Sequence, residues 1–570
     1  MLNKKLYKET KNFIYEIARN KIIVQAVLTG LTAGLLVVLF RLGISKLFIN
    51  VQNFVGNFDF SYKMLLFPLI TTLGGLISGF LVCKFAPEAK GSGIPYVKMT
   101  LNRMGNLTRV RSIFVKFFAG IAGIGTGLSL GREGPSVQLG AGAGALIGKI
   151  FKMKGTDKDK LIAAGAGSAI AATFNAPIAG TVFVLEELIN NFSSSLLFPV
   201  LIATVCADCL SRNILGNSPC FIIPQITTDL TFVNYLVFIV FGIIAGSVGV
   251  LFSKVIFFNN KLFDKIQAIP DFVKPAIAGF VVGIAGLFVP YILGSGNISV
   301  DMLLAGKFSL SLLTLIFVLK FFITPFCFGS GAAGGIFLPT LMLGAFLGYM
   351  TSCILNFAGI NINPVLLAVL GMGAFLSGVA RTPVTAAVMV FEMTGSYGFI
   401  LPIMLCCAIA DLTAEKLGHK PIYSMLIVNS STKNGDAKIL SESKVKNIMS
   451  SKIDSVNIFD SLETAKKLIK SSNHTEIPVI NRTGSLCGYI SKENIEDLIF
   501  QGNSSNIEIQ KVMNPNPVTI FQNENLYIAY FRLHFNNVKA IFVTDKFNRL
   551  KGIITRKDIL SALEKSKEND

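Results

Sequence analysis

Three short segments rich in glycine and proline interrupt long apolar stretches of this chain. They are Gly91-Ser92-Gly93-Ile94-Pro95, Gly131-Arg132-Glu133-Gly134-Pro135 and Gly335-Ile336-Phe337-Leu338-Pro339. Glycine permits unusual backbone dihedrals, and proline suits the first turn of a helix. Each segment therefore predicts a helix start whose free N–H groups attract an anion. The alternative is that these residues only pack and kink helices, since glycine and proline are frequent in membrane helices.

Two glutamates stand out against this apolar background. Glu133 lies inside the second segment, where an ionised carboxylate can occupy an anion position and a protonated one can swing away. Its alternative role is an ion pair with the adjacent Arg132. Glu187 follows Glu186 directly after the uncharged run Leu161–Leu185. A carboxylate pair is costly in an apolar helix, so it predicts either a functional site or the cytoplasmic end of the helix.

The composition requires a membrane around these segments. Of 570 residues, 52% are hydrophobic and only 15% are charged, and Phe321–Ala380 contains no charged side chain. About 20 apolar residues suffice to cross a bilayer, whereas a soluble core has no need of such runs. Basic residues precede the first long apolar segment, Ile22–Phe40, and positive flanks stay in the cytoplasm. The net charge of +19 therefore indicates membrane topology, with a cytoplasmic N-terminus, rather than nucleic-acid binding.

The apolar part repeats itself at a spacing near 205 positions. Gly131 and Gly335 begin similar segments 204 positions apart, and Gly91 and Gly294 begin similar Gly-Ser-Gly segments 203 positions apart. Pro177 precedes Glu186 by nine positions, as Pro383 precedes Glu392. Two related halves are a common transporter plan, often inverted, with the binding site where the halves meet.

The composition changes after Ile427, where charged and polar residues become frequent. The tail also repeats, with an offset of 64 positions that relates Val445–Met449 to Ile509–Met513 and Gly488–Asn494 to Gly552–Asp558. Each unit predicts a short strand, a helix, two strands and a final helix.

The three glycine-rich segments, in this order and at these spacings, resemble the selectivity-filter motifs of the CLC family of chloride channels and transporters. Phe174–Gly180, which leads into Glu186-Glu187, and Lys420–Ser424 resemble two further segments of that family. The resemblance covers roughly residues 20–427. It implies an all-α polytopic membrane domain of two inverted-repeat halves, a homodimer in the cell membrane, and secondary active exchange of chloride for protons. The alternative is a passive chloride channel gated by voltage or pH.

The resemblance also assigns roles to residues. Ser92 and Tyr423 would offer hydroxyl groups to chloride, and Ile336 and Phe337 would offer backbone amides. Glu133 would be the gate and external proton-transfer group, and Glu187 the internal proton-transfer group. Ser92 could instead be a helix cap, and Tyr423 an interfacial aromatic residue. The complete filter comprises Gly91, Ser92, Gly93, Ile94, Pro95, Gly131, Arg132, Glu133, Gly134, Pro135, Gly335, Ile336, Phe337, Leu338 and Pro339.

The repeated tail resembles a tandem pair of cytoplasmic α/β CBS domains. That resemblance implies regulation of transport and an adenine-nucleotide site, with Ser491, Asn494, Thr555 and Asp558 as candidate ligands. The alternative is a dimerising scaffold that binds no nucleotide. The predicted organisation is a basic cytoplasmic N-terminus over residues 1–20, a transport domain over 21–428, a linker over 429–440, and CBS domains over 441–502 and 503–566.

Other classes of function lack the residues that they need. The only histidines are His419, His474 and His534, and neither an HExxH nor a GxSxG pattern occurs, so an intramembrane hydrolase is not expected. Cys206 and Cys209 form one lone CxxC pair, which is too few ligands for a structural zinc site. A cation transporter would need several oxygen ligands in its pore, and the charge-free third segment supplies no carboxylate. No enzyme activity, metal, redox cofactor or nucleic acid is therefore expected.

Overall fold

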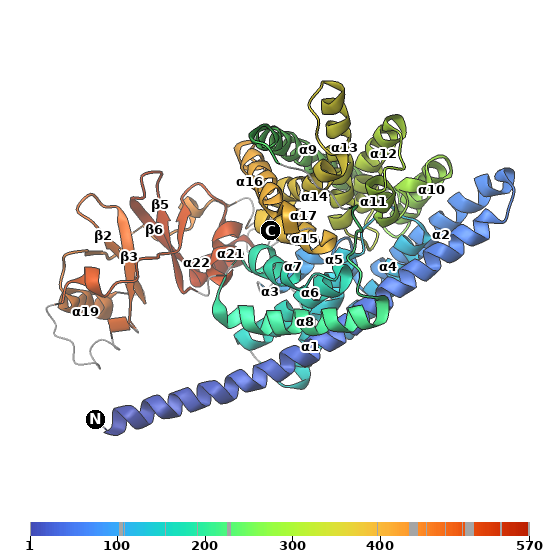
Figure 1. Ribbon diagram of the computed structural model, residues 1–570. Coiled ribbons are helices and arrows are strands. Elements are labelled where there is room, and N and C mark those ends of the chain that lie inside the picture. The colour runs from blue at the N-terminus through green and yellow to red at the C-terminus, as the bar shows by residue number, and fades with distance from the viewer. Residues whose placement is uncertain are drawn as a thin grey trace. The chain divides into compact units, whose positions relative to one another are not determined.

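The computed structural model describes residues 2–101, 107, 109–153, 155–190, 192–224, 230–395, 397–431, 440, 443–451, 453–472, 475–492, 494–495, 507–535 and 538–567. The chain divides into two compact units, Met1–Met425 and Leu426–Asp570, which are considered separately (Figure 1). Most of the expected linker, residues 432–439, and the expected boundary between the two CBS domains lie outside the described residues.

The first unit is helical throughout its described part. Six of its described helices are long and apolar enough to cross a membrane, and the expectation of a polytopic membrane domain is confirmed. These spans are Lys21–Gly56, Phe60–Phe85, Ser194–Leu215, Phe232–Lys265, Leu310–Gly329 and Phe337–Phe357. The first helix already begins at Leu2, so the basic N-terminal segment continues directly into the first span.

The α-helices of the first half of this unit are α1 (Leu2–Gly56), α2 (Phe60–Phe85), α3 (Ile94–Leu101), α4 (Val110–Thr126), α5 (Glu133–Ile150), α6 (Gly155–Phe174), α7 (Pro177–Phe183) and α8 (Ser194–Leu215). Those of the second half are α9 (Phe232–Lys265), α10 (Lys274–Phe288), α11 (Asn297–Leu304), α12 (Leu310–Gly329), α13 (Phe337–Phe357), α14 (Pro364–Ala380), α15 (Pro383–Thr394), α16 (Ile400–Lys416) and α17 (Ile422–Ser431).

The repeat in sequence is a repeat in packing. Helix α5 packs on α6, and α13 packs on α14 in the same way. A Cβ atom at Gly140 would lie 2.2 Å from the carbonyl oxygen of Gly165, and one at Gly344 would lie 2.2 Å from that of Gly371. Only glycine permits these backbones to approach so closely. The same helix–helix contact is therefore built twice, with glycines at corresponding positions.

Buried lysines provide a second repeated contact. Lys116 Nζ donates to the carbonyl oxygens of Ala89 and Gly91 at 2.8 and 2.5 Å. Lys320 Nζ donates at 2.9 and 2.7 Å to the carbonyl oxygens of Ile292 and Gly294, which lie 203 positions after Ala89 and Gly91. A buried ammonium group needs such partners because its charge has left water. Each lysine thus fixes the loop before a Gly-Ser-Gly segment.

The second unit contains two three-stranded sheets of identical design. In the first, β1 (Val456–Asn457) pairs in parallel with β2 (Glu476–Ile480), which pairs antiparallel with β3 (Leu486–Ser491). In the second, β4 (Thr519–Phe521), β5 (Ala540–Thr544) and β6 (Leu550–Thr555) repeat this order. The helices are α19 (Leu462–Ser471), α21 (Leu526–Phe535) and α22 (Arg556–Lys567).

The offset of 64 positions holds for individual contacts in this unit. Tyr489 and Asn514 exchange backbone hydrogen bonds of 3.0 and 2.8 Å. Ser450 and Ile553, each offset by 64 from one of that pair, exchange bonds of 2.9 and 3.0 Å. The two modules therefore face each other across an approximate two-fold axis, as the tandem repeat predicts.

Candidate functional site

All three glycine-rich segments lead into helices, as the sequence predicts. Helix α3 begins at Ile94, α5 at Glu133 and α13 at Phe337. The second and third segments meet directly: the N–H of Gly131 donates to the carbonyl of Gly335 at 2.7 Å, and the N–H of Gly335 donates back at 2.6 Å. Corresponding positions of the two halves thus bond to each other, which brings the starts of α5 and α13 together.

Glu133 lies at this junction and is completely buried, with 0% of its surface exposed. Its Oε2 atom accepts a hydrogen bond of 3.4 Å from the backbone N–H of Leu338, in the first turn of α13. Its Oε1 atom has no partner, and among the described residues it forms no ion pair with Arg132. A carboxylate therefore sits at the electropositive end of a helix, where an anion would also be stabilised.

The other predicted anion ligands are buried nearby in the same unit. Ser92 is 2% exposed, and its hydroxyl has no hydrogen-bond partner among the residues that the structure describes, so it does not act as a helix cap. It lies against Gly134, where an added Cβ atom would come within 2.3 Å of Ser92 Oγ. Ile336 and Phe337 are buried at the start of α13. The first and third segments thus both approach the segment that contains Glu133.

Tyr423 lies in the first turn of α17 and is also buried, so it is not an interfacial aromatic residue. It lies within electrostatic range of both Glu133 and Glu187. This proximity to both carboxylates was not evident from the sequence, because Glu187 and Glu133 are each more than 200 positions away from Tyr423.

Glu187 occupies a π-helical turn, Val184–Leu188, that continues α7. It forms a buried ion pair with Lys98, whose Nζ lies 2.7 Å from Glu187 Oε1. Lys98 belongs to α3, the helix that follows the Ser92 segment. Sequence analysis did not single out Lys98, although a lysine just after a filter motif is itself an intramembrane charge. Glu187 is therefore an interior residue rather than an exposed helix end.

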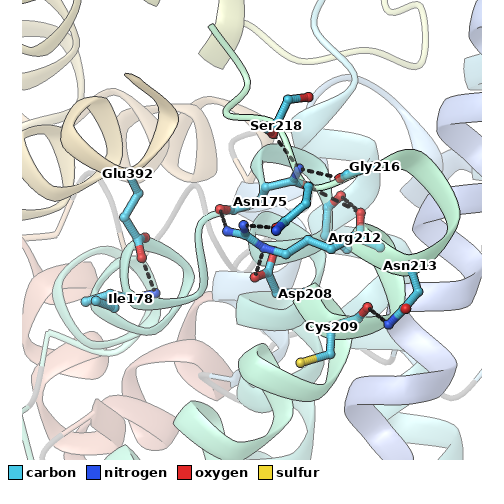
Figure 2. A network of polar contacts seen from close by, with 12 residues as sticks. Asn175, Ile178, Asp208, Cys209, Arg212, Asn213, Gly216, Ser218 and Glu392 are labelled. Carbon is cyan, nitrogen blue, oxygen red and sulfur yellow. Dashed lines mark hydrogen bonds and ion pairs between the residues drawn. The ribbon is translucent and has the colours of Figure 1, made fainter. Parts of the chain in front are cut away.

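Its neighbour Glu186 has a different environment. The two oxygens of Glu186 accept from the N–H groups of Val384 and Thr385, at 3.1 and 2.6 Å, at the start of α15. Glu392, 206 positions later, accepts at 3.1 and 2.7 Å from the corresponding N–H groups at the start of α7, one of them that of Ile178 (Figure 2). Each carboxylate caps the start of a helix in the other half. This contact gives both intramembrane glutamates a structural role, so neither needs a role in transport.

Beside Glu392, a polar network supports the entry into α7 (Figure 2). Arg212 donates to Asp208 at 2.6 Å and to the carbonyl of Asn175 at 2.7 Å. Asn175 has a positive φ of 55° and precedes the proline-initiated helix. These contacts hold the turn that positions Phe174, whose ring lies 5.9 Å from that of Phe337.

The four candidate nucleotide ligands lie at equivalent turns of the second unit. Thr555 N and Oγ1 both donate to Asp558 Oδ2 at 2.7 Å, and the N–H of Asn494 donates to Ser491 Oγ at 3.2 Å. The structure brings each pair together after a strand, where the side chains close the following helical turn. In the second module the Thr555 hydroxyl and the Asp558 carboxylate thus already bond to each other.

Metal chemistry has no evident location in the part of the chain that the structure describes. No group of three or more histidine, cysteine, aspartate or glutamate residues there could hold a metal ion. Cys206 and Cys209 are both free thiols.

Comparison with known proteins gives consistent matches. The family model described as voltage gated chloride channel matches residues 74–415, and the CBS domain model matches residues 445–500 and 509–565. The chain is 38% identical over 367 residues to the H(+)/Cl(-) exchange transporter ClcA of Vibrio parahaemolyticus, which covers 63% of this chain and 78% of that protein. It is 35% identical over 430 residues to ClcA of Yersinia pestis, covering 73% and 89%.

Solved structures show the same fold. A slow cyanobacterial Cl-/H+ antiporter is similar with a TM-score of 0.69 and 29% identity, over 73% of this chain and 99% of that one. A eukaryotic CLC transporter is similar with a TM-score of 0.66 and 20% identity, over 95% of this chain and 98% of that one. The second likeness extends the common fold through the CBS pair.

Proposed function

Because this chain belongs to the voltage gated chloride channel family, we propose that its membrane unit exchanges chloride for protons across the membrane. The curated relatives described above are named as H(+)/Cl(-) exchange transporters, which supports exchange over passive conduction. The protein is accordingly a transporter rather than an enzyme, and it needs no resident cofactor.

The observation that carries the proposal is the position of Glu133. Its carboxylate occupies the first turn of α13, where chloride would be held by the same N–H groups. Chloride and the ionised side chain therefore compete for one position. Protonation removes the negative charge and lets the side chain leave, so that anion and proton movement are linked at a single residue.

The chloride site itself would lie just inward of this gate. Ser92 supplies a buried hydroxyl without a partner, and Tyr423 supplies a second hydroxyl. The backbone amides of Ile336 and Phe337 complete the set. Such a site offers partial rather than full positive charges, which binds a weakly hydrated anion and still releases it.

The proton would leave the common route toward Glu187. Tyr423 interacts electrostatically with both carboxylates, which supports a route from one to the other in its neighbourhood. Lys98 holds Glu187 in a single position, 2.7 Å away, and balances its charge when it is ionised. Lys98 is thus a positioning residue for the internal proton-transfer group.

Orientation, assembly and regulation follow from the same family. We place the N-terminus and the CBS pair in the cytoplasm, because basic residues precede the first span. The protein would be a homodimer in the cell membrane with one transport route in each subunit. The CBS pair would regulate transport and take an adenine nucleotide at Thr555 and Asp558, with Ser491 and Asn494 at the equivalent turn.

The test uses purified protein in sealed liposomes with an outward chloride gradient and a pH-sensitive dye. An exchanger uses the chloride gradient to drive protons uphill, and a protonophore abolishes that gradient of protons. Chloride efflux without proton movement would identify a passive channel and refute exchange. The absence of protein-dependent chloride efflux would refute anion transport altogether.

A further inference from the structure

A second site lies apart from the chloride site, in a cavity of about 420 Å³. It is lined by the last turns of the first membrane span, including Phe48 and Gln52, by Arg132, and by the loop that leads into α11 at Ile298. Cavities of this size hold small organic molecules rather than single ions. None of the proposed chloride ligands lines it, so the cavity is a candidate ligand site distinct from the chloride site.

Arg132 gives the cavity its chemical preference. The side chain is only 7% exposed, yet its Nε has no hydrogen-bond partner, and its guanidinium group makes no ion pair in the described part of the chain. A buried guanidinium without partners is costly unless a ligand meets it. The Nε2 atom of Gln52, a second buried donor on the cavity wall, is also without a partner. Two buried donors that lack an acceptor favour the binding of a ligand with an anionic group.

The surrounding charges point the same way. Arg41 and Glu133 do not line the cavity, but both interact electrostatically with Arg132, so a second guanidinium group and one carboxyl group lie in its surroundings. The loop at Gly294-Ser295-Gly296 adds the start of α11, whose first N–H groups have no partner within the helix. This loop is the second-half counterpart of the Ser92 loop, which supplies a chloride ligand in the proposed function.

The remaining walls are largely apolar, although Ser45, Asn297 and Ser299 also line the cavity. Ile44, Phe48 and Ile298 line the cavity together with Pro290 and Leu293. An inorganic anion would leave these surfaces without a contact, whereas an organic anion would cover them. The chemistry on the page thus fits a ligand with one acidic group and one apolar group.

We propose that this outer cavity binds a small organic monoanion, such as an aromatic sulfonate or carboxylate. Its acidic group would lie at Arg132 and Gln52, and its apolar group against Phe48 and Ile298. The wall residues from the first span lie near the end opposite its basic flank, so the cavity opens on the external side if the N-terminus is cytoplasmic. Because Arg132 adjoins the gate residue Glu133, the bound anion would slow exchange; this last step rests on the proposed function.

Binding can be measured without transport, because the natural chain contains no tryptophan. A Phe48→Trp substitution in the full-length protein places a single fluorophore in the cavity wall. The probe is 4-nitrobenzenesulfonate, whose nitro group quenches tryptophan fluorescence, and the neutral 4-nitrobenzenesulfonamide is its charge control. We expect saturable quenching by the sulfonate only. Adding Arg132→Gln should weaken the apparent affinity about tenfold or more, because a charge-assisted contact is lost.

Two further variants keep the result decisive. Ile298→Trp reports from the opposite wall at a side chain that is 60% exposed, and it serves if Phe48→Trp does not fold. Ile243→Trp, at a 46% exposed position on α9 outside the cavity, should show no saturable quenching. Equal quenching in all three positions, equal quenching by the neutral amide, or an unchanged affinity after Arg132→Gln would each overturn the site.

The effect on transport is measured separately, with 4-nitrobenzenesulfonate outside liposomes that contain the unmodified protein, at a concentration that saturates the fluorescence signal. Slower chloride efflux supports inhibition, and full efflux with a saturated site overturns it. If the protein shows no efflux even without the probe, the proposed function fails, while the fluorescence result still decides the binding site.

Discussion

Lys116 in the first half of the membrane unit and Lys320 in the second make equivalent contacts, and so do Glu186 and Glu392. Both lysines hold two loop carbonyls, and both glutamates cap a helix of the other half. All four are intramembrane charges whose partners lie within the protein. The two halves therefore share one framework of buried polar contacts.

The halves differ where ions would move. Glu133 corresponds, at the offset of 204, to the apolar Phe337. Lys98 corresponds at 203 to the exposed Asp301, and Glu187 corresponds at 206 to Met393. The backbone differs as well, because Glu187 lies in a π-helical turn whereas the equivalent part of α15 is a regular helix. Such turns occur frequently at functional sites.

The comparison separates two kinds of buried charge. Buried charged residues that occur at equivalent positions in both halves stabilise the fold. Buried charged residues that occur in only one half are candidates for a role in transport. A duplicated scaffold can retain its structural contacts in both copies while one copy acquires the chemistry. The predictions that follow set a residue of the first half against its counterpart in the second.

Among the paired positions, Glu133 and Phe337 should differ most in how a substitution affects proton coupling. Glu133→Gln removes the titratable group at the start of α13 and should reduce proton transport to the level of protein-free liposomes, while chloride still moves. Phe337→Leu changes the equivalent side chain but leaves the backbone amide, so proton coupling should remain. Both are measured as chloride-driven proton uptake with a pH-sensitive dye. Undiminished coupling in Glu133→Gln would remove this residue from the gate.

Substitutions at Lys98 and Asp301 should show the next largest difference, both in thermal stability and in proton flux. Lys98→Met leaves the carboxylate of Glu187 buried without its partner, and breaking a buried pair costs about 3–5 kcal/mol. We expect a markedly lower thermal midpoint and at least about a tenfold loss of proton flux relative to chloride flux. Asp301→Asn alters an exposed residue and should change neither quantity. A Lys98→Met protein with normal stability and coupling would show that the ion pair has no role.

Restoring charge balance sharpens this test. In the double variant Lys98→Met with Glu187→Gln, no buried charge remains unpaired, so much of the stability should return. Proton flux should stay low, because the proton-transfer group is absent. Recovery of stability without recovery of proton flux would distinguish the structural from the transport role of the pair.

The framework lysines should behave alike. Lys116→Met and Lys320→Met each leave two buried carbonyl oxygens without a donor, and each should lower the free energy of unfolding by about 2 kcal/mol. Chloride–proton coupling should persist in the folded fraction of both variants. Thermal unfolding in detergent measures the first quantity and liposome flux the second. A selective loss of coupling in only one variant would argue against a common structural role.

Local sequence was sufficient to predict the helix starts and both repeats. Glycine and proline at Gly131 and Pro135 specify a helix start by their backbone properties, and a repeat is visible as a constant offset. The succession of strands and helices along the CBS pair followed from the same kind of pattern, including the helices that begin at Leu462 and Leu526. These features depend on residues that are close in sequence or related by duplication.

Contacts between distant positions could not be predicted in this way. Lys98 and Glu187 are 89 positions apart, and nothing in the periodicity of either helix pairs them. Glu392 had no assigned role, because its partners are backbone N–H groups more than 200 positions away. Backbone donors leave no signature in a sequence, so a structural glutamate and a functional one have the same appearance there.

Substitutions at Glu186 and Glu392 should differ least, and only in how much stability they cost. Each caps a helix with two accepted N–H bonds, so replacement by glutamine should cost about 1 kcal/mol, because one acceptor and the charge are lost. Glu186 also accepts a 2.6 Å bond from the Thr385 hydroxyl, so Glu186→Gln should be slightly the more destabilising. Neither variant should alter proton coupling, in contrast to Glu187→Gln one position away. Thermal midpoints and liposome flux on the three variants decide this point: a coupling defect in Glu186→Gln as well as in Glu187→Gln, but not in Glu392→Gln, would mean that the first half uses both adjacent glutamates for transport.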